Sequence, residues 1–111
     1  MIRGVPDHTN MIDVGGAISL TFYCGELPAE AAIIAAGHEP NGYFWEGMIQ
    51  YLAPTLAEQV DLDSEAGMFS AEGDLAVLEQ IRVLIDPYLD DGERVATAIR
   101  EAEASGFQFD D

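Results

Sequence analysis

The sequence predicts an α+β fold in which an antiparallel sheet of about four strands is covered mainly on one face by helices. Apolar residues alternate over short segments in two places, and they recur at helical spacing in the segments between and after them. The expected order of elements is ββααββαα or close to it, without the strand–helix–strand repeat of a parallel sheet. With 111 residues, 49% of them hydrophobic, we expect a single domain over residues 1–111.

Two strands are expected first, at residues 11–14 and 17–24. Gly15 and Gly16 join them, and this pair can take the positive φ angles of a tight hairpin turn. The second strand alternates, which predicts a core-facing side and an opposite side. The core-facing residues would be Ile18, Leu20, Phe22 and Cys24, and the opposite ones Ser19, Thr21 and Tyr23.

Two helices are expected next. Pro28 suits the first position of a short helix through residue 36, because it lacks an N–H that a helix start leaves unbonded, and Gly37 suits its C-terminal end. From residue 43 the apolar spacing predicts a longer helix with a wide buried face. Pro54 is expected to kink or end that helix.

A second hairpin and two further helices complete the predicted order. The hairpin strands are expected at residues 60–62 and 68–71, with Gly67 as a left-handed residue before the returning strand. Asp74 suits the N-cap of a helix that would stop at Asp86 and the proline after it. Asp91 marks the start of a last helix, which would run toward Gly106.

The charge is strongly one-sided, with 21 Asp and Glu against four Arg, no Lys and a net charge of -17. Such charge repels itself, so a basic partner and a salt-rich solvent are its two simplest explanations. It disfavours direct binding of nucleic acid and of anionic membranes. We also expect no membrane span, since apolar runs are far shorter than the roughly 20 residues required. Residues 1–8 lack the apolar segment of a signal peptide, so we expect a cytoplasmic protein.

Residue types that carry catalysis are sparse. Cys24 lies in an alternating strand and is expected to act as a small buried hydrophobe, and as the single cysteine it cannot form an internal disulfide. His38 beside Glu39 is expected to be a solvated loop histidine. No glycine-rich phosphate loop and no zinc-ligand spacing occur in the sequence. We therefore expect neither an enzyme nor a cofactor.

One set of acidic residues matches the register of a calcium-binding loop only in part. Ala66 stands where that loop requires Gly, and the flanking segments predict strands where helices are needed. An ordinary acidic hairpin is therefore favoured over a metal site. The residues at loop positions 1, 3, 5 and 12 are Asp61, Asp63, Glu65 and Glu72.

Three consecutive aromatic residues, Tyr43, Phe44 and Trp45, stand at the predicted start of the longer helix. Neighbours on a helix are about 100° apart, so the three cannot all face one core. Either Phe44 and Trp45 belong to the core and Tyr43 covers the turn, or Tyr43 or Trp45 is an exposed anchor for a partner.

Two motifs resemble the Imm51 family of bacterial immunity proteins. One is the segment 38–46, with its Asn-Gly-Tyr-x-Trp helix entry, and the other is 63–71, with its acidic-Ala-Gly-Met-Phe hairpin. The resemblance extends over about residues 17–86. It implies a small α+β cytoplasmic protein that binds and neutralises the toxin domain of a polymorphic toxin system, and it carries over no catalytic or toxin-contacting residue.

The leading hypothesis is therefore an immunity protein that blocks a toxin, possibly a nuclease with a basic surface, by steric and electrostatic occlusion. Two alternatives remain open: an acidic mimic of nucleic acid that inhibits a DNA-binding protein, and a salt-adapted domain without a toxin partner. Residues 56–111 hold 15 of the acids, so the contact is expected there. The candidate residues are Asp61, Asp63, Glu65, Asp86, Asp90, Asp91 and Glu93, with Tyr43 or Trp45 as the aromatic anchor.

Overall fold

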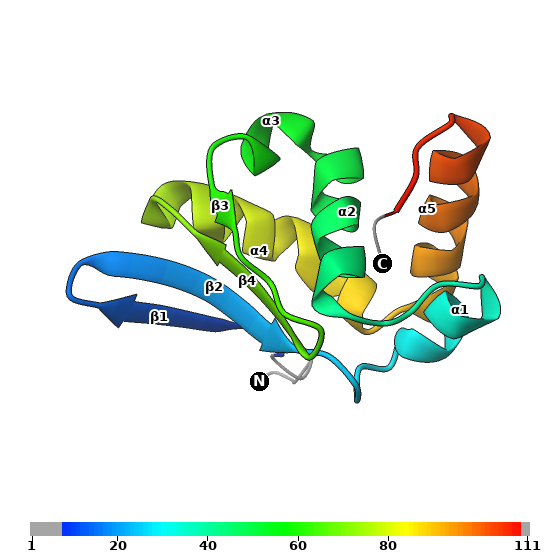
Figure 1. Cartoon of the computed structure of the whole chain (residues 1–111), viewed down its shortest axis with the longest axis horizontal. Helices are drawn as coiled ribbons and strands as arrows, with labels where there is room; N and C mark the ends of the chain where they lie inside the picture. The colour runs from blue at the N-terminus through cyan, green and yellow to red at the C-terminus, as the bar shows by residue number, and fades with distance from the viewer. Residues whose placement is uncertain (1–7, 110–111) are drawn as a thin grey trace, which may run out of the picture.

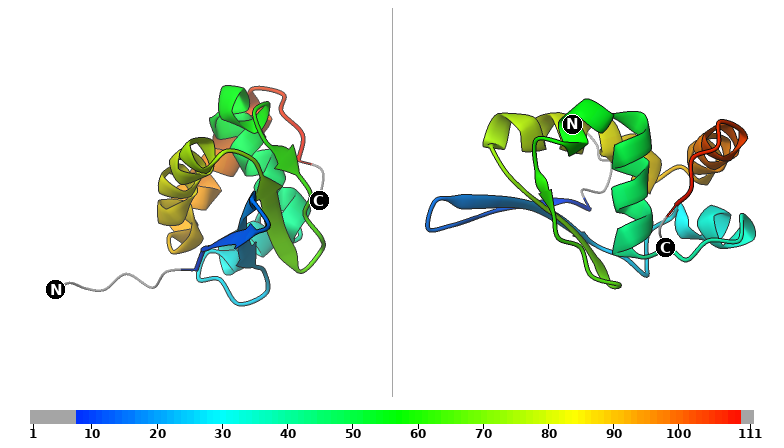
Figure 2. Two further views of the ribbon diagram at one scale, coloured as in Figure 1. Left: turned by 90° about the vertical axis from the view of Figure 1, so that its left-hand side faces the viewer. Right: turned by 45° about the horizontal axis from the view of Figure 1, so that its top comes forward.

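The computed structural model describes residues 8–109, in which a four-stranded antiparallel sheet has the order β1-β2-β4-β3. The strands are β1 (Asn10–Val14), β2 (Ala17–Tyr23), β3 (Asp61–Leu62) and β4 (Met68–Glu72). The helices are α1 (Glu30–Ala35), α2 (Gly42–Leu52), α3 (Pro54–Ala57), α4 (Leu75–Leu89) and α5 (Gly92–Ala104). Helices cover one side of the sheet (Figures 1 and 2). The predicted fold class is confirmed, with α3 as an additional short helix in the predicted order.

The first hairpin forms as predicted. Gly15 and Gly16 have φ angles of 62° and 92°, and they bring Val14 opposite Ala17. Leu20 and Phe22 on β2 are fully buried, as the alternation indicates. Thr21 faces the opposite side but is also buried, because the paired strands β1 and β4 flank it on both sides.

Helix α1 begins at Glu30, two residues later than predicted. Ala29 donates its N–H to the carbonyl of Leu89 at 3.2 Å, and this bond to α4 holds Pro28 and Ala29 in a turn ahead of the helix. The end of the helix agrees with the prediction. Gly37 has a φ of 88°, and the N–H of His38 bonds back to the carbonyl of Ile33, which closes the last turn.

Helix α2 is capped by Asn41, whose side chain accepts a hydrogen bond from the N–H of Phe44 at 2.9 Å. Pro54 ends this helix as expected, because α2 stops at Leu52 and Pro54 becomes the first residue of α3. The chain therefore changes direction at Ala53 without losing helical structure on either side.

The predicted C-terminal boundary of helix α4 is wrong. The helix was expected to stop at Asp86, but it continues through Pro87 to Leu89. Ile85 and Leu89 are one turn apart and both fully buried, so burial of Leu89 offsets the backbone hydrogen bond that Pro87 cannot make. Asp74 does occupy the N-cap, but its side chain makes no capping bond, whereas Asp91 caps α5 through the N–H of Arg94 at 3.1 Å.

A second correction concerns Gly67, which does not adopt the left-handed φ that was expected. The turn closes instead by a pair of backbone hydrogen bonds between Glu65 and Met68, at 2.8 and 3.2 Å. These bonds form a small antiparallel bridge, which makes a left-handed residue unnecessary.

The core lies between the sheet and the helices α2, α4 and α5. Its largest members are four aromatic residues that are all fully buried. They are Trp45, Phe22, Phe44 and Phe69. Among the described residues, no helix combines the length and the apolar character needed to cross a membrane.

Candidate protein-binding surface

The face of the sheet opposite the helices is built of rows of side chains that the strand register sets side by side. One row crosses all four strands and combines Ile12, Ser19, Glu72 and Asp61. The next contains Asn10, Thr21 and Ser70, and Asp63 extends it by donating its N–H to the carbonyl of Ser70 at 2.9 Å. A third joins Tyr23 to Met68, which bridges to Glu65. Each row therefore begins with an uncharged residue and ends at an acid.

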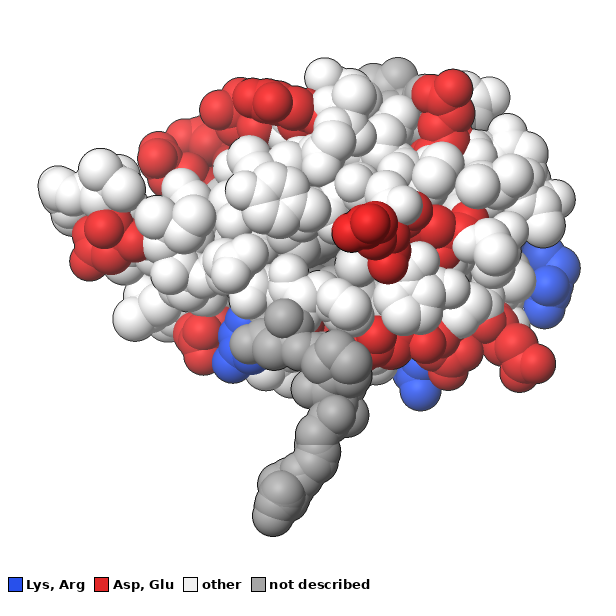
Figure 3. Space-filling view, turned by 90° about the horizontal axis from the view of Figure 1, so that it is seen from below, with Lys and Arg blue, Asp and Glu red and all other residues white. Residues whose placement is uncertain are grey.

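We call Asp61, Asp63, Glu65 and Glu72 the acidic border of this face. All four residues are exposed. Asp61 and Glu72 are direct cross-strand partners, a like-charge pairing that destabilises the sheet slightly. The three Arg residues of the described chain all lie on α4 and α5, and none forms an ion pair with the border. Viewed from below, acidic side chains lie in several separate groups over the surface, with uncharged side chains between them (Figure 3).

Helix α2 holds the turn that carries the acidic border. Glu46 accepts a hydrogen bond from the N–H of Ser64 at 2.9 Å, and the hydroxyl of Ser64 accepts one from the N–H of Ser70 at 3.0 Å. Gly42 donates its N–H to the carbonyl of Ala66 at 3.2 Å. A Cβ at Gly42 would overlap the carbonyl oxygens of Glu65 and Met68, so only glycine permits this approach.

The two segments that carry the family resemblance therefore contact one another. Tyr43 follows Gly42 directly and is 41% exposed, which places an aromatic ring at the helix start beside the turn. Trp45 is fully buried and lies edge-on to the rings of Phe22 and Phe44, at 5.7 and 5.3 Å. The expectation that Trp45 could be an exposed anchor is thus wrong, because its side of α2 packs on the sheet, and Tyr43 is the candidate that remains.

The acids at the junction of α4 and α5 differ from the border, because most of them have partners within the chain. Asp90 contacts Nε2 of His8 at 2.7 Å, and Asp86 lies 3.6 Å from the guanidinium of Arg82. Asp91 caps α5 and approaches the side chain of Arg94. Glu93 is exposed in the first turn of α5, where a negative charge stabilises the helix.

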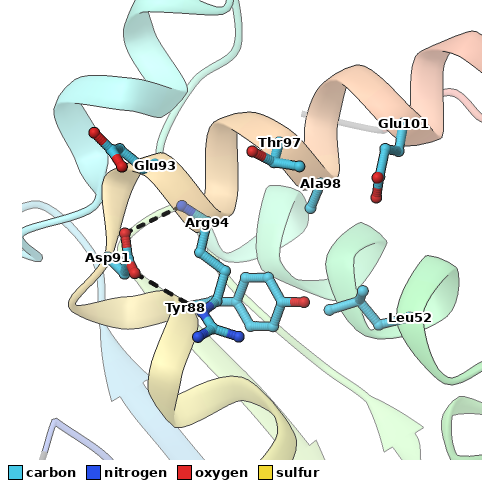
Figure 4. A pocket seen from close by; sticks show the side chains of 8 residues that line it. All are labelled: Leu52, Tyr88, Asp91, Glu93, Arg94, Thr97, Ala98 and Glu101. Carbon is cyan, nitrogen blue, oxygen red and sulfur yellow. Dashed lines mark hydrogen bonds and ion pairs between the residues drawn. The ribbon is translucent and has the colours of Figure 1, made fainter.

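A pocket of about 370 Å³ lies at this junction (Figure 4). The guanidinium of Arg94 sits over the ring of Tyr88, with 5.6 Å from its carbon to the ring centroid, and Asp91 holds it from the other side. The walls carry acids, one arginine and a phenol, but neither a thiol nor a histidine lines the pocket.

His38 is not the solvated loop residue that was expected. Its side chain is largely buried, and its ring lies 5.1 Å from that of Phe109 and 5.9 Å from that of Phe44. Nε2 of His38 contacts the carboxylate of Glu103 at 2.9 Å. The C-terminal segment contributes to this burial, since Phe109 packs against both His38 and Phe44 of α2.

Cys24 is partly buried at the end of β2 and has the environment of an unreactive thiol. Burial raises its pKa to about 11, the nearby carboxylate of Glu30 adds to the shift, and a hydrogen bond with the backbone of Phe69 opposes it. Glu30 is itself buried and accepts a hydrogen bond from the N–H of Gly25 at 2.6 Å. A thiol that stays protonated at neutral pH is a poor nucleophile and a poor metal ligand.

No group of three or more potential metal ligands is present within residues 8–109. Of the four acids in the calcium-loop register, Asp61, Asp63 and Glu65 end the three strand rows, and Glu72 lies next to Asp61 within the first row.

Three residues that position this surface were missed by the sequence analysis. Glu72 was considered only as a calcium ligand, although the alternation of β4 puts it on the same face as Ser70. Glu46 and Gly42 join α2 to the turn, and no local signal identifies that contact because 18 residues separate Glu46 from Ser64.

Comparison of the chain with protein-family models, with curated proteins and with solved structures found no match. The resemblance to Imm51 therefore rests on the two motifs alone.

Proposed function

We propose that this protein is an immunity protein, which binds a cognate bacterial toxin in the cytoplasm and neutralises it by steric and electrostatic occlusion without chemistry of its own. The observation that carries the proposal is the acidic border, four exposed acids at one side of an open sheet face, to which no cation within residues 8–109 is paired. The contact between the two motif segments supports it further, since both belong to one surface that also includes Tyr43.

The border suits a basic partner for an electrostatic reason. Charges that already face a cation contribute less to attraction, and two of the acids at the α4–α5 junction, Asp86 and Asp91, face Arg82 and Arg94. Unpaired acids retain their field, which steers a basic protein toward the face and raises the association rate above the neutral value of about 10⁵–10⁶ M⁻¹s⁻¹. The uncharged rows beside the border then offer area that a docked partner can bury.

The rigid support of the border favours binding as well. Helix α2 fixes the turn through Glu46 and Gly42, so little conformational entropy is lost when the turn meets a partner. An aromatic residue such as Tyr43 provides a large contact area at low entropic cost.

The decisive experiment uses the protein encoded by the neighbouring gene. That protein should be toxic when expressed alone, should be neutralised when this chain is co-expressed, and should co-purify with it. Failure of rescue together with failure of co-purification would contradict the proposal.

A pair of variants with equal charge change then locates the contact. The border variant carries Asp61→Asn, Asp63→Asn and Glu65→Gln, and the junction variant carries Asp90→Asn, Asp91→Asn and Glu93→Gln. The border variant should slow toxin association at low salt and flatten its salt dependence, whereas the junction variant should change both less. The reverse order, measured by stopped-flow fluorescence, would assign the contact to the junction.

A further inference from the structure

The open face of the sheet has two chemically different ends. At the β1 end, Ile12 is 43% exposed and Val14 is 71% exposed, and the exposed Ala17 lies opposite Val14. We call these three residues the apolar patch. At the other end, the row that begins at Ile12 finishes with the acids Glu72 and Asp61. An apolar group and an acidic pair therefore share one row of side chains.

The acid of β1 does not belong to the apolar patch. Asp13 pairs with Ile18 on the helix side of the hairpin, and its carboxylate accepts a hydrogen bond from the N–H of Gly16 at 3.1 Å. Because side chains alternate along a strand, this carboxylate and the side chain of Val14 lie on opposite faces. Only Ser19, which is uncharged, separates Ile12 from the acids within their row.

The distance between the two ends follows from the strand order. The outer strands are β1 and β3, with β2 and β4 between them. Neighbouring strands lie about 4.8 Å apart, so Ile12 is roughly 10 Å from Glu72 and roughly 14 Å from Asp61. A partner that contacts both ends must present an apolar group and a cation at that separation.

A second copy of the chain fits this face poorly in the two limiting symmetric arrangements. Sheets stacked about an axis along the rows would set acid against acid, and sheets stacked about an axis across the rows would set the acids of each copy on the apolar patch of the other. The first arrangement is repulsive, and the second desolvates carboxylates without supplying a cation. The net charge of -17 on each chain adds repulsion to both.

The complement of this face is a basic protein surface. Lys or Arg would pair with the acidic border, to which the described part of the chain supplies no cation. An aliphatic or aromatic side chain at the other end would cover Ile12 and Val14 and remove their apolar area from water. A reversed partner would place its cations on the apolar patch, so the face selects an orientation as well as a partner.

We propose that the open sheet face binds a basic protein surface in one orientation, with an aliphatic or aromatic side chain on the apolar patch and Lys or Arg on Glu72 and Asp61. The inference rests on the proposed function in using the same surface, and it adds the apolar contact and the direction of docking. It does not require the partner to be a toxin, so its test uses a peptide.

The probe is a synthetic helical peptide with Leu in its first turn and Lys in its last turn, about 14 Å apart at a rise of about 1.5 Å per residue. A nitroxide amino acid at one end or the other shows which part of the ¹⁵N-labelled full chain lies nearby. The label at the Leu end should broaden the amide signals of the apolar patch, and the label at the Lys end should broaden those of Asp61 and Glu72. Equal broadening of the same signals by both labels would overturn the proposal.

Substitutions test each end separately. Ile12→Thr with Val14→Thr keeps β-branched side chains in the strand and should weaken peptide binding about tenfold, which corresponds to roughly 1.4 kcal/mol. Val83→Thr, at a residue of α4 that is 66% exposed, is the matched control and should leave the affinity unchanged. Glu72→Gln should weaken binding mainly at low ionic strength, and Glu101→Gln on the exposed side of α5 should do so much less. Val14→Thr alone provides the comparison if the double variant does not fold.

Further results would contradict the proposal. Equal weakening by Val14→Thr and Val83→Thr would remove the apolar patch from the contact. A dimer in sedimentation that Val14→Thr dissociates would make a second copy the occupant. Rescue of cells from the neighbouring toxin together with an unoriented peptide would overturn this inference alone, whereas an oriented peptide without rescue would support it and contradict the immunity function.

Discussion

The carboxylate of Glu46 accepts a 2.9 Å hydrogen bond from the backbone N–H of Ser64, and this bond ties the middle of α2 to the turn between β3 and β4. The two residues are far apart in sequence and belong to the two segments that carry the family resemblance. Their contact joins α2 and the acidic border into one structural unit. Substitution of Glu46 tests this contact directly.

Glu46→Ala removes the acceptor and leaves the N–H of Ser64, which is partly buried, without its partner. The free energy of unfolding should fall by about 1.5–3 kcal/mol, the usual cost of a lost hydrogen bond to a charged group. Urea titration followed by circular dichroism measures the change. Gln50→Ala, on the exposed side of the same helix, serves as control, and an equal loss in both variants would show that the bond contributes nothing.

Gly42→Ala should be more damaging, because the new Cβ would overlap two backbone carbonyl oxygens that cannot rotate away. We expect a loss of about 1–3 kcal/mol from overpacking, seen as a lower midpoint of thermal unfolding. Gly67→Ala is the matched control, since nothing lies within 4 Å of its added Cβ and its φ is not left-handed. A Gly42→Ala protein as stable as Gly67→Ala would refute the close approach of α2 to the turn.

Phe109→Ala tests whether the C-terminal segment is part of the fold. The ring of Phe109 stacks on Phe44 with centroids 4.9 Å apart, and its edge would lie 2.9 Å from a Cβ at Gly47. Because Phe109 is only partly buried, the expected loss is about 2 kcal/mol, below the 3–5 kcal/mol of a fully buried Phe. Gln108→Ala, an exposed neighbour, should change the unfolding midpoint little.

Cys24 should react with iodoacetamide only at high pH. Its thiol stays protonated until the pH approaches about 11, so the alkylation rate should still be rising there, whereas the urea-unfolded chain should already react near the ordinary pKa of 9.0. Glu30→Gln removes the negative charge that raises this pKa and should move the folded curve to lower pH. Equal rates at neutral pH in folded and unfolded protein would contradict the assignment.

The raised pKa of the Cys24 thiol also makes the free energy of unfolding fall at alkaline pH. The unfolded chain releases the thiol proton before the folded one does, so the contribution of this group to stability should be lost as the pH rises from 9 to about 11. Cys24→Ser should remove this component of the alkaline loss of stability, measured by urea unfolding at several pH values.

The sequence by itself determined the strands, most helix boundaries and the class of the fold, because these depend on local periodicity and on backbone preferences. The hairpin at Gly15 and the cap at Asp91 follow from interactions within a few residues. Two boundaries depend instead on tertiary contacts. The backbone hydrogen bond from Ala29 to Leu89 accounts for the late start of α1, and burial of Leu89 in the core accounts for the continuation of α4 to that residue.

Some features of the candidate surface likewise follow from the sequence, and others follow only from the tertiary structure. Composition indicated the acids of the hairpin, but only strand register could align Asp61 with Glu72 on one face, and only packing could bury Trp45 while leaving Tyr43 exposed. The tertiary structure also separated acids that have intramolecular partners from those that do not. Such pairing depends on residues as distant in sequence as His8 and Asp90, and a net charge alone carries no information about it.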